Sequence, residues 1–213
     1  MILLGLALVF TWLVFREIRN PAEKKRDAFS WGYIIVLGAL AIGCARPAYN
    51  IWQLERILTK NAAIVTQRPD VSVKCNSIFG TILGGKAAEP LAGTAYFGTG
   101  EIFFENSWCD AFIEYLDDPE GASRDGVFSM HIFAHEVMHI RGERNESATD
   151  CQAIQRNHKI GELLGIDRAT AIKNSRRYYV EIYPRHPYYN TECRPKGRLD
   201  ENLADSIWSH IED

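Results

Sequence analysis

The chain has 213 residues, a formal net charge of −3 and a hydrophobic fraction of 46%. This length is enough for one medium-sized domain with a sizeable core, together with shorter additional segments. No basic stripe interleaved with aromatic residues occurs, so we expect no nucleic-acid partner. The excess of apolar residues lies in the first 45 positions.

Two uncharged apolar runs near the N-terminus predict two membrane spans. Met1–Phe15 and Phe29–Ala45 are each at or just below the about 17–25 residues that a membrane helix needs. The linker over residues 16–28 carries five arginine and lysine side chains, which the positive-inside rule assigns to the cytoplasm. We therefore expect residues 1–45 to form a membrane hairpin and residues 46–213 to form an extracytoplasmic domain at the cell membrane.

A cleaved signal peptide is an alternative interpretation of the first run. It would need a basic segment before the apolar residues and small residues at the cleavage site. No basic residue precedes this run, and Phe15-Arg16-Glu17 is a poor cleavage site. A single membrane anchor is the second alternative. The charge difference that sets the orientation is modest, because Arg46, Arg56 and Lys60 follow the second run.

Four of the five cysteines lie beyond the apolar runs, at Cys75, Cys109, Cys151 and Cys193. Their wide spacing, without a Cys-x-x-Cys motif, favours two disulfides in an oxidising compartment over a zinc knuckle. Three pairings are possible, and proximity in the sequence favours Cys75–Cys109 and Cys151–Cys193. Buried free thiols in a cytoplasmic domain are the alternative.

The pattern of the remaining chain predicts a mixed α+β domain with a small sheet. A short amphipathic helix over residues 47–59 would leave the membrane, and a glycine-rich stretch runs through Gly84-Gly85. Alternating or short apolar segments predict strands over residues 71–75, 94–97 and 101–104, the last two joined by a turn at 98–100. Helical periodicity predicts further helices over residues 107–116, 127–140, 145–164 and 167–183.

The most informative motif is His135-Glu136-Val137-Met138-His139. Two histidines one helical turn apart project from the same face, so both imidazoles can reach one metal ion. The glutamate beside the first histidine would stand next to a metal-bound water and act as general base, as in zinc metalloproteases. We leave out His131, one turn earlier, as a satisfied helix residue.

A catalytic zinc site needs a third protein ligand. Asn145-Glu146 begins the next predicted helix, and if Gly142 turns the chain back, Glu146 would face His139. Asp150 lies one turn further on the same face. It would accept a hydrogen bond from the far ring nitrogen of a ligating histidine and so fix the tautomer of that ring.

These two motifs, HExxH and then Asn145-Glu146-x-x-x-Asp150, resemble the gluzincins, the thermolysin-like zincin metallopeptidases. The resemblance implies a zincin-like domain that holds Zn²⁺ through His135, His139 and Glu146, with Glu136 as base. It covers about sixteen residues, and the gap between the motifs is much shorter than in thermolysin. The metzincin frame is the alternative, with Asn145 where that family has a third histidine. The segment with Cys151 and Cys193 also resembles bacterial membrane or secreted proteins that carry a similar HExxH motif.

The implied reaction is hydrolysis of peptide bonds in a peptide or protein substrate. Candidates for stabilising the oxyanion are Tyr178, Tyr179, His186, Tyr188 and Tyr189. We expect residues 101–104 to be the edge strand that binds the peptide by strand addition. The alternatives are a non-catalytic binding or scaffold protein with this fold, and a zinc hydrolase of a non-peptide amide.

Overall fold

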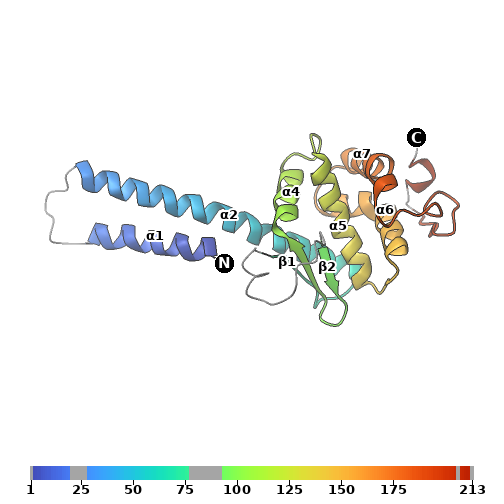
Figure 1. Cartoon of the computed structure of the whole chain (residues 1–213), viewed down its shortest axis with the longest axis horizontal. Helices are drawn as coiled ribbons and strands as arrows, with labels where there is room; N and C mark the ends of the chain where they lie inside the picture. The colour runs from blue at the N-terminus through green and yellow to red at the C-terminus, as the bar shows by residue number, and fades with distance from the viewer. Residues whose placement is uncertain (1, 20–27, 77–92, 205–206, 212–213) are drawn as a thin grey trace. The chain divides into compact units, whose positions relative to one another are not determined.

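A computed structural model of the chain describes residues 2–19, 28–76, 93–204 and 207–211. The chain divides into two compact units, Met1–Gln53 and Leu54–Asp213, and each is considered by itself (Figure 1). Three of the predicted linker charges, Lys24, Lys25 and Arg26, lie outside the described residues, as does the glycine-rich stretch at Gly84-Gly85.

The N-terminal unit consists of helix α1 (Ile2–Arg19) and the first part of helix α2 (Ala28–Thr66). Within the described residues, one helix is long and apolar enough to cross a membrane, from Trp31 onward in α2. Our expectation of two spans was wrong, because the uncharged part of α1 ends at Phe15 and the helix closes with Arg16, Glu17 and Arg19. Length and composition define this candidate, and a signal sequence near the N-terminus would have both properties.

The apolar side chains of this unit are largely exposed. Leu8, Ile35 and Ile42 are 63%, 67% and 69% exposed, and only 17% of the apolar window of α2 is buried. The core helix of a soluble protein buries its apolar face against other elements. The lack of such burial in α2 favours a lipid environment over a soluble core.

Helix α2 continues through Pro47 to Thr66, so the separate helix expected over residues 47–59 is part of one longer helix. Proline removes one backbone hydrogen bond from a helix interior, but packing beyond this point offsets the loss. Leu54, Leu58 and Ala62 are buried in the second unit. The helix ends before Gln67, whose φ of 57° is incompatible with its continuation.

The sheet of the second unit has three strands in the order β1 (Ser72–Asn76), β3 (Glu101–Glu105), β2 (Gly93–Tyr96). β1 is parallel to β3, and β2 is antiparallel to it, with Ala95 opposite Ile102. The three predicted strands are therefore present. The expected edge strand, residues 101–104, is instead the central strand β3, because β1 pairs with its other side. β2 is the edge strand.

Four helices follow the sheet, and their arrangement builds the domain (Figure 1). They are α4 (Asn106–Asp117), α5 (Arg124–Ile140), α6 (Glu146–Leu163) and α7 (Arg168–Arg177). The side chains of Ser123, Asn145 and Asp167 cap α5, α6 and α7 by accepting backbone N–H groups three residues ahead. α5 packs against α4, α6 and β2, and nearly all of its residues are buried. It is therefore the central helix of the domain.

The helix predicted over residues 167–183 is shorter than expected. α7 ends at Arg177, and a π-helical turn over Tyr178–Ile182 and a 3₁₀ turn over Tyr183–Arg185 continue the chain. Pro184 lacks an N–H group and cannot extend an α-helix. The altered winding lets the buried Tyr178 ring stack on His131, with ring centres 3.6 Å apart.

Two disulfides join distant parts of the domain. Cys75–Cys109 links β1 to α4, and Cys151–Cys193 links α6 to the C-terminal segment, which confirms the favoured pairing. Cys44 is free. Disulfides of this kind are typical of an oxidising, extracellular environment.

Candidate metal centre

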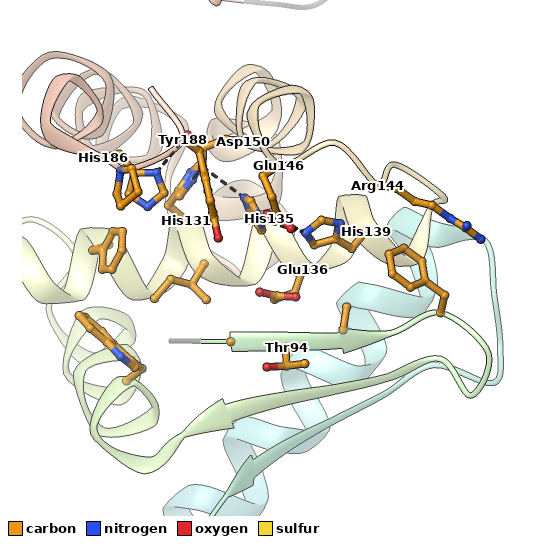
Figure 2. A pocket seen from close by; sticks show the side chains of 17 residues that line it. Thr94, His131, His135, Glu136, His139, Arg144, Glu146, Asp150, His186 and Tyr188 are labelled. Carbon is orange, nitrogen blue, oxygen red and sulfur yellow. Dashed lines mark hydrogen bonds and ion pairs between the residues drawn. The ribbon is translucent and has the colours of Figure 1, made fainter. Parts of the chain in front are cut away.

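A cavity of about 680 Å³ lies between α5, the edge strand β2, the start of α6 and the segment after Arg185 (Figure 2). His135, Glu136 and His139 line it from α5, and Glu146 lines it from α6. The structure thus brings all four residues of the predicted site to one cavity. Asp150, the fifth, lies behind His135 and reaches the cavity wall.

Three side-chain atoms converge in this cavity. His135 Nε2 lies 3.0 Å from His139 Nε2 and 3.1 Å from Glu146 Oε2. His139 Nε2 lies 3.3 Å from the same carboxylate oxygen. The histidines share a face of α5 because they are one turn apart, and Glu146 belongs to the first turn of the next helix.

A tight turn between α5 and α6 makes this convergence possible. The N–H of Gly142 donates to His139 O, and the N–H of Glu143 donates to Met138 O, which is the Schellman pattern at a helix end. Gly142 has a φ of 113°, a conformation that favours glycine. The chain then reverses within a few residues, and the side chain of Asn145 caps α6 by accepting the N–H of Ala148. Asn145 stands where the metzincin pattern has its third histidine, and its side chain caps α6.

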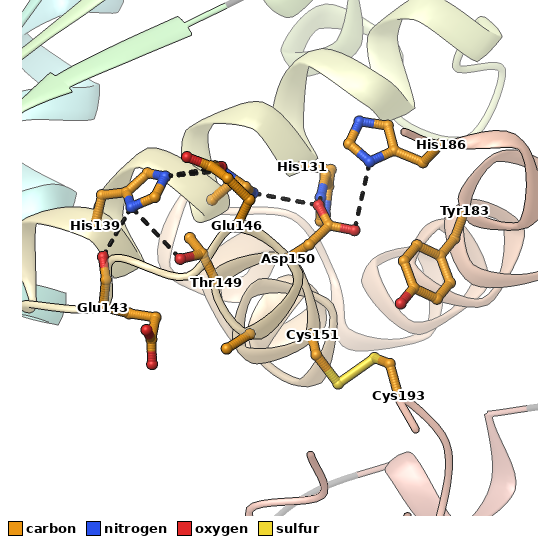
Figure 3. A network of polar contacts seen from close by, with 12 residues as sticks. His131, His139, Glu143, Glu146, Thr149, Asp150, Cys151, Tyr183, His186 and Cys193 are labelled. Carbon is orange, nitrogen blue, oxygen red and sulfur yellow. Dashed lines mark hydrogen bonds and ion pairs between the residues drawn. A yellow bond between two sulfur atoms is a disulfide. The ribbon is translucent and has the colours of Figure 1, made fainter. Parts of the chain in front are cut away.

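The partners of each histidine fix its tautomer (Figure 3). His135 Nδ1 lies 3.2 Å from Asp150 Oδ1, and His139 Nδ1 lies 2.8 Å from the backbone oxygen of Glu143. Because both partners only accept, each Nδ1 carries the proton. In the neutral rings both Nε2 atoms, which face Glu146, then have a lone pair available for a metal ion; when His135 is protonated, its Nε2 instead donates to Glu146 Oε2.

Three acceptors this close to one another repel unless a positive charge lies between them. Ligands at about 2.0–2.2 Å from a tetrahedral metal ion lie about 3.3–3.6 Å apart, close to the separations found here. His135, His139 and Glu146 can therefore hold one metal ion. A second group, His131, His135 and Asp150, also has ligand atoms close enough to hold an ion.

The second group is better described as a hydrogen-bond network. His131 Nε2 donates to Asp150 Oδ1 over 2.7 Å, and Asn157 Nδ2 lies 3.1 Å from His131 Nδ1. Both ring nitrogens of His131 thus have hydrogen-bond partners. In the sequence, the position of His131 one helical turn before His135 could have indicated that it also contacts Asp150. His186 Nδ1 lies 3.6 Å from Asp150 Oδ2, and Figure 3 shows His131 and His186 beside this carboxylate. With the contact from His135 Nδ1, three histidines lie around one buried carboxylate.

No protein-family model matches the chain, and no curated protein or solved structure matches it either. The resemblance to gluzincins therefore rests on the two sequence motifs.

The charges of the site perturb its titrating groups. Burial disfavours a charge on His135, but its hydrogen bonds to Asp150 and Glu146 outweigh this and raise its pKa to about 9. Burial also raises the pKa of Glu136 to about 7, although the charge of His135 opposes this effect. The pKa of Glu146 is lowered, chiefly by its hydrogen bond with His135. The site thus favours a positive charge among His135, His139 and Glu146.

Of the five candidates for stabilising an oxyanion, His186 and Tyr188 line the cavity. The ring of Tyr188 stacks on His135, with ring centres 5.7 Å apart. Tyr178 is buried against His131, and the hydroxyl group of Tyr179 donates to Cys193 O. Tyr189 packs against Tyr183 and does not line the cavity. The sequence alone could not separate these candidates, because the turns after Arg177 decide which side chains face α5.

Proposed function

We propose that this protein is a zinc-dependent metallopeptidase of gluzincin type, anchored in the membrane by α2. The observation that carries this proposal is the meeting of His135 Nε2, His139 Nε2 and Glu146 Oε2 within 3.3 Å, beside the buried carboxylate of Glu136. Two imidazoles and one carboxylate, with space for water or substrate in the cavity, form the donor set of catalytic zinc sites. Structural zinc sites instead close all four positions with protein ligands.

In this proposal His135, His139 and Glu146 hold the ion, and Asp150 orients His135. A bound zinc ion would lower the pKa of water toward about 7 and polarise a substrate carbonyl. The hydrogen bond from His135 Nδ1 to Asp150 keeps the imidazole from rotating and increases its basicity. Glu143 O does the same for His139.

Glu136 is the proposed general base. Its carboxylate is buried and contacts the backbone of Ala95 in the edge strand β2. A pKa raised to about 7 suits a group that takes a proton and returns it near neutral pH. Glu136 would accept a proton from the attacking water and pass it to the leaving amine.

The other cavity residues suggest how a peptide would be held. His186 and Tyr188 carry N–H and O–H donors into the cavity and would stabilise the oxyanion of the tetrahedral intermediate. β2 replaces β3 as the strand that would pair with the substrate backbone. Its residues Thr94 and Ala95 line the cavity, and its outer edge is not paired with any described strand.

The proposed location is the outer face of a membrane. The exposed apolar surface of α2 supports membrane insertion, and two disulfides support an extracytoplasmic domain. Tyr49 and Trp52 follow the apolar run and contact each other, with ring centres 5.8 Å apart. Aromatic residues at the end of a span are typical of the membrane–water interface.

Metal analysis and peptide digestion of the 213-residue protein in detergent test the proposal. We expect about one zinc ion per chain and cleavage of a peptide library that a chelator abolishes. Glu136→Gln should retain zinc and lower kcat by about 10²–10⁴-fold, the usual contribution of general acid–base catalysis. Glu114→Gln, an exposed carboxylate on α4 outside the cavity, is the matched control.

Each outcome separates the alternatives. Absence of stoichiometric zinc would overturn the catalytic proposal. Zinc binding without peptide cleavage would indicate a binding protein or a hydrolase of another amide. Full activity of Glu136→Gln would remove the assigned role of this glutamate.

A further inference from the structure

The two ends of the cavity differ in chemistry. At one end the ring of Phe97 lies 5.7 Å from that of His139, and the guanidinium of Arg144 lies 5.5 Å from the centre of the Phe97 ring. At the other end the ring of Phe128 lies 5.7 Å from that of His186 and 5.0 Å from that of Trp108. Figure 2 shows Arg144 and His186 at opposite ends of the site, with His135 and Glu136 between them.

Arg144 is a lining residue of this cavity with a permanent positive charge. Among the described residues, no carboxylate forms an ion pair with its guanidinium. The adjacent acids are engaged elsewhere, because Glu143 accepts the backbone N–H groups of Arg144 and Asn145 and Glu146 faces the histidines. The contact with the Phe97 ring does not neutralise the charge of Arg144. It also leaves the N–H groups of the guanidinium available to bind a carboxylate.

Phe97, the residue that Arg144 packs against, is itself held in place. Phe97 begins the turn between β2 and β3, and Arg68 Nη1 donates to its backbone oxygen over 3.2 Å. Arg68 is in turn held by two hydrogen bonds to Asp70. The guanidinium of Arg144 thus lies at the edge of the cavity, against an aromatic residue whose backbone is held by Arg68.

The other charged side chains of the cavity lining are acidic or are histidines. Glu136, Glu146 and Asp150 all line it, and Arg144 is the one lysine or arginine among the described lining residues. Away from the proposed metal ion, a carboxylate of a ligand would therefore be bound at the Arg144 end. Arginine binds carboxylates with two parallel hydrogen bonds, which fixes orientation as well as charge.

We propose that Arg144 binds a carboxylate of the peptide substrate and so determines which bond is presented to Glu136. This inference rests on the proposed peptidase function. The substrate class is a peptide with an acidic group on the Arg144 side of the cleaved bond and a large apolar side chain on the Phe128 side. Two sources supply the same chemistry, an aspartate or glutamate side chain and the C-terminal carboxylate.

Direct binding separates this inference from the proposed activity. The 213-residue Glu136→Gln protein with zinc added would be titrated with fluorescein-labelled heptapeptide pools that contain one phenylalanine and otherwise neutral random positions. Matched pools carry Glu or Gln on either side of the phenylalanine, each with a free or an amidated C-terminus. Arg144→Gln and Arg124→Gln, each introduced into this background, are compared. Arg124 is an exposed arginine at the start of α5 outside the cavity.

We expect an acidic pool to bind about fivefold more tightly than its neutral match, the upper range for an exposed ion pair. Arg144→Gln should remove this preference, and Arg124→Gln should retain it. A preference for Glu over Gln assigns a side chain, and a preference for acid over amide assigns the C-terminus. Equal binding of all pools, a preference that survives Arg144→Gln, or an equal loss in Arg124→Gln would overturn the inference. Peptide binding without cleavage by the wild-type protein would count against the peptidase proposal alone.

Discussion

Gly93 lies so close to Glu136 that a side-chain carbon at this position would stand 2.9 Å from the carboxylate oxygen Oε1. The same carbon would lie 2.8 Å from Cγ2 of Ile132. The edge strand β2 therefore touches α5 through a residue without a side chain. This contact sets how closely the strand approaches the proposed base.

Gly93→Ala should displace the carboxylate of Glu136 without disturbing the metal ligands. A misplacement of about 1 Å can lower a rate by about 10²-fold, so we expect kcat to fall by that order while zinc content stays at the wild-type value. Gly98→Ala is the control, because a side-chain carbon at Gly98 meets no atom within 4 Å. Equal activities of the two variants would show that this contact does not position Glu136.

His131→Ala should weaken both the fold and metal binding. It removes a buried ring that donates to Asp150 and accepts from Asn157. We expect a loss of about 2–4 kcal/mol in the free energy of unfolding and a zinc affinity about tenfold lower, because Asp150 orients His135. Thermal unfolding and competition with a zinc indicator measure the two effects. His131→Gln, which can still donate, should recover part of the affinity; a stability loss with unchanged affinity would limit His131 to packing.

Acid should destabilise the protein through Asp150. Burial alone would raise the pKa of this carboxyl group, but the charge and hydrogen bond of His131, with the hydrogen bond of His135, lower it well below 3.8. The stabilisation is complete above the unfolded pKa of about 3.9 and is lost as the pH falls below it, because only the unfolded chain then takes up a proton. The difference in Tm between the wild-type protein and Asp150→Asn should therefore be large at pH 7 and shrink below about pH 4. A difference that stays constant with pH would contradict this account.

Loss of the Cys151–Cys193 disulfide should affect the site more than loss of Cys75–Cys109. The bonds close loops of 42 and 34 residues, so each should contribute about 4 kcal/mol through the unfolded state. Cys151 follows Asp150, and Cys193 anchors the segment that carries His186 and Tyr188. At equal loss of stability, the Cys151→Ser/Cys193→Ser variant should lose more kcat than Cys75→Ser/Cys109→Ser. Equal kcat values would mean that the segment holds its position without the covalent link.

Local patterns in the sequence predicted much of this domain. The 3.6-residue periodicity located α6 and the start of α7, and cysteine spacing indicated the disulfide pairs. The interval between His139 and Glu146 was short enough to require a turn, and Gly142 supplied it.

Features set by long-range packing could not be predicted in the same way. Strand order depends on the pairing of β1 with β3 across residues far apart in the chain, so the pattern within residues 101–104 could not show that this strand is central. The continuity of α2 depends on burial of Leu58 by other elements. The positions of His186 and Tyr188 depend on turns whose winding is set by packing against α5.

The turn at Gly142 has a consequence for how the domain is made. The three proposed metal ligands fall within twelve consecutive residues, His135 to Glu146, so bringing them together closes only a short loop. During synthesis this segment is complete while more than sixty residues remain to be added. An ion captured at that stage would hold α5 and the first turn of α6 together before the C-terminal segment, with His186 and Tyr188, exists to cover them.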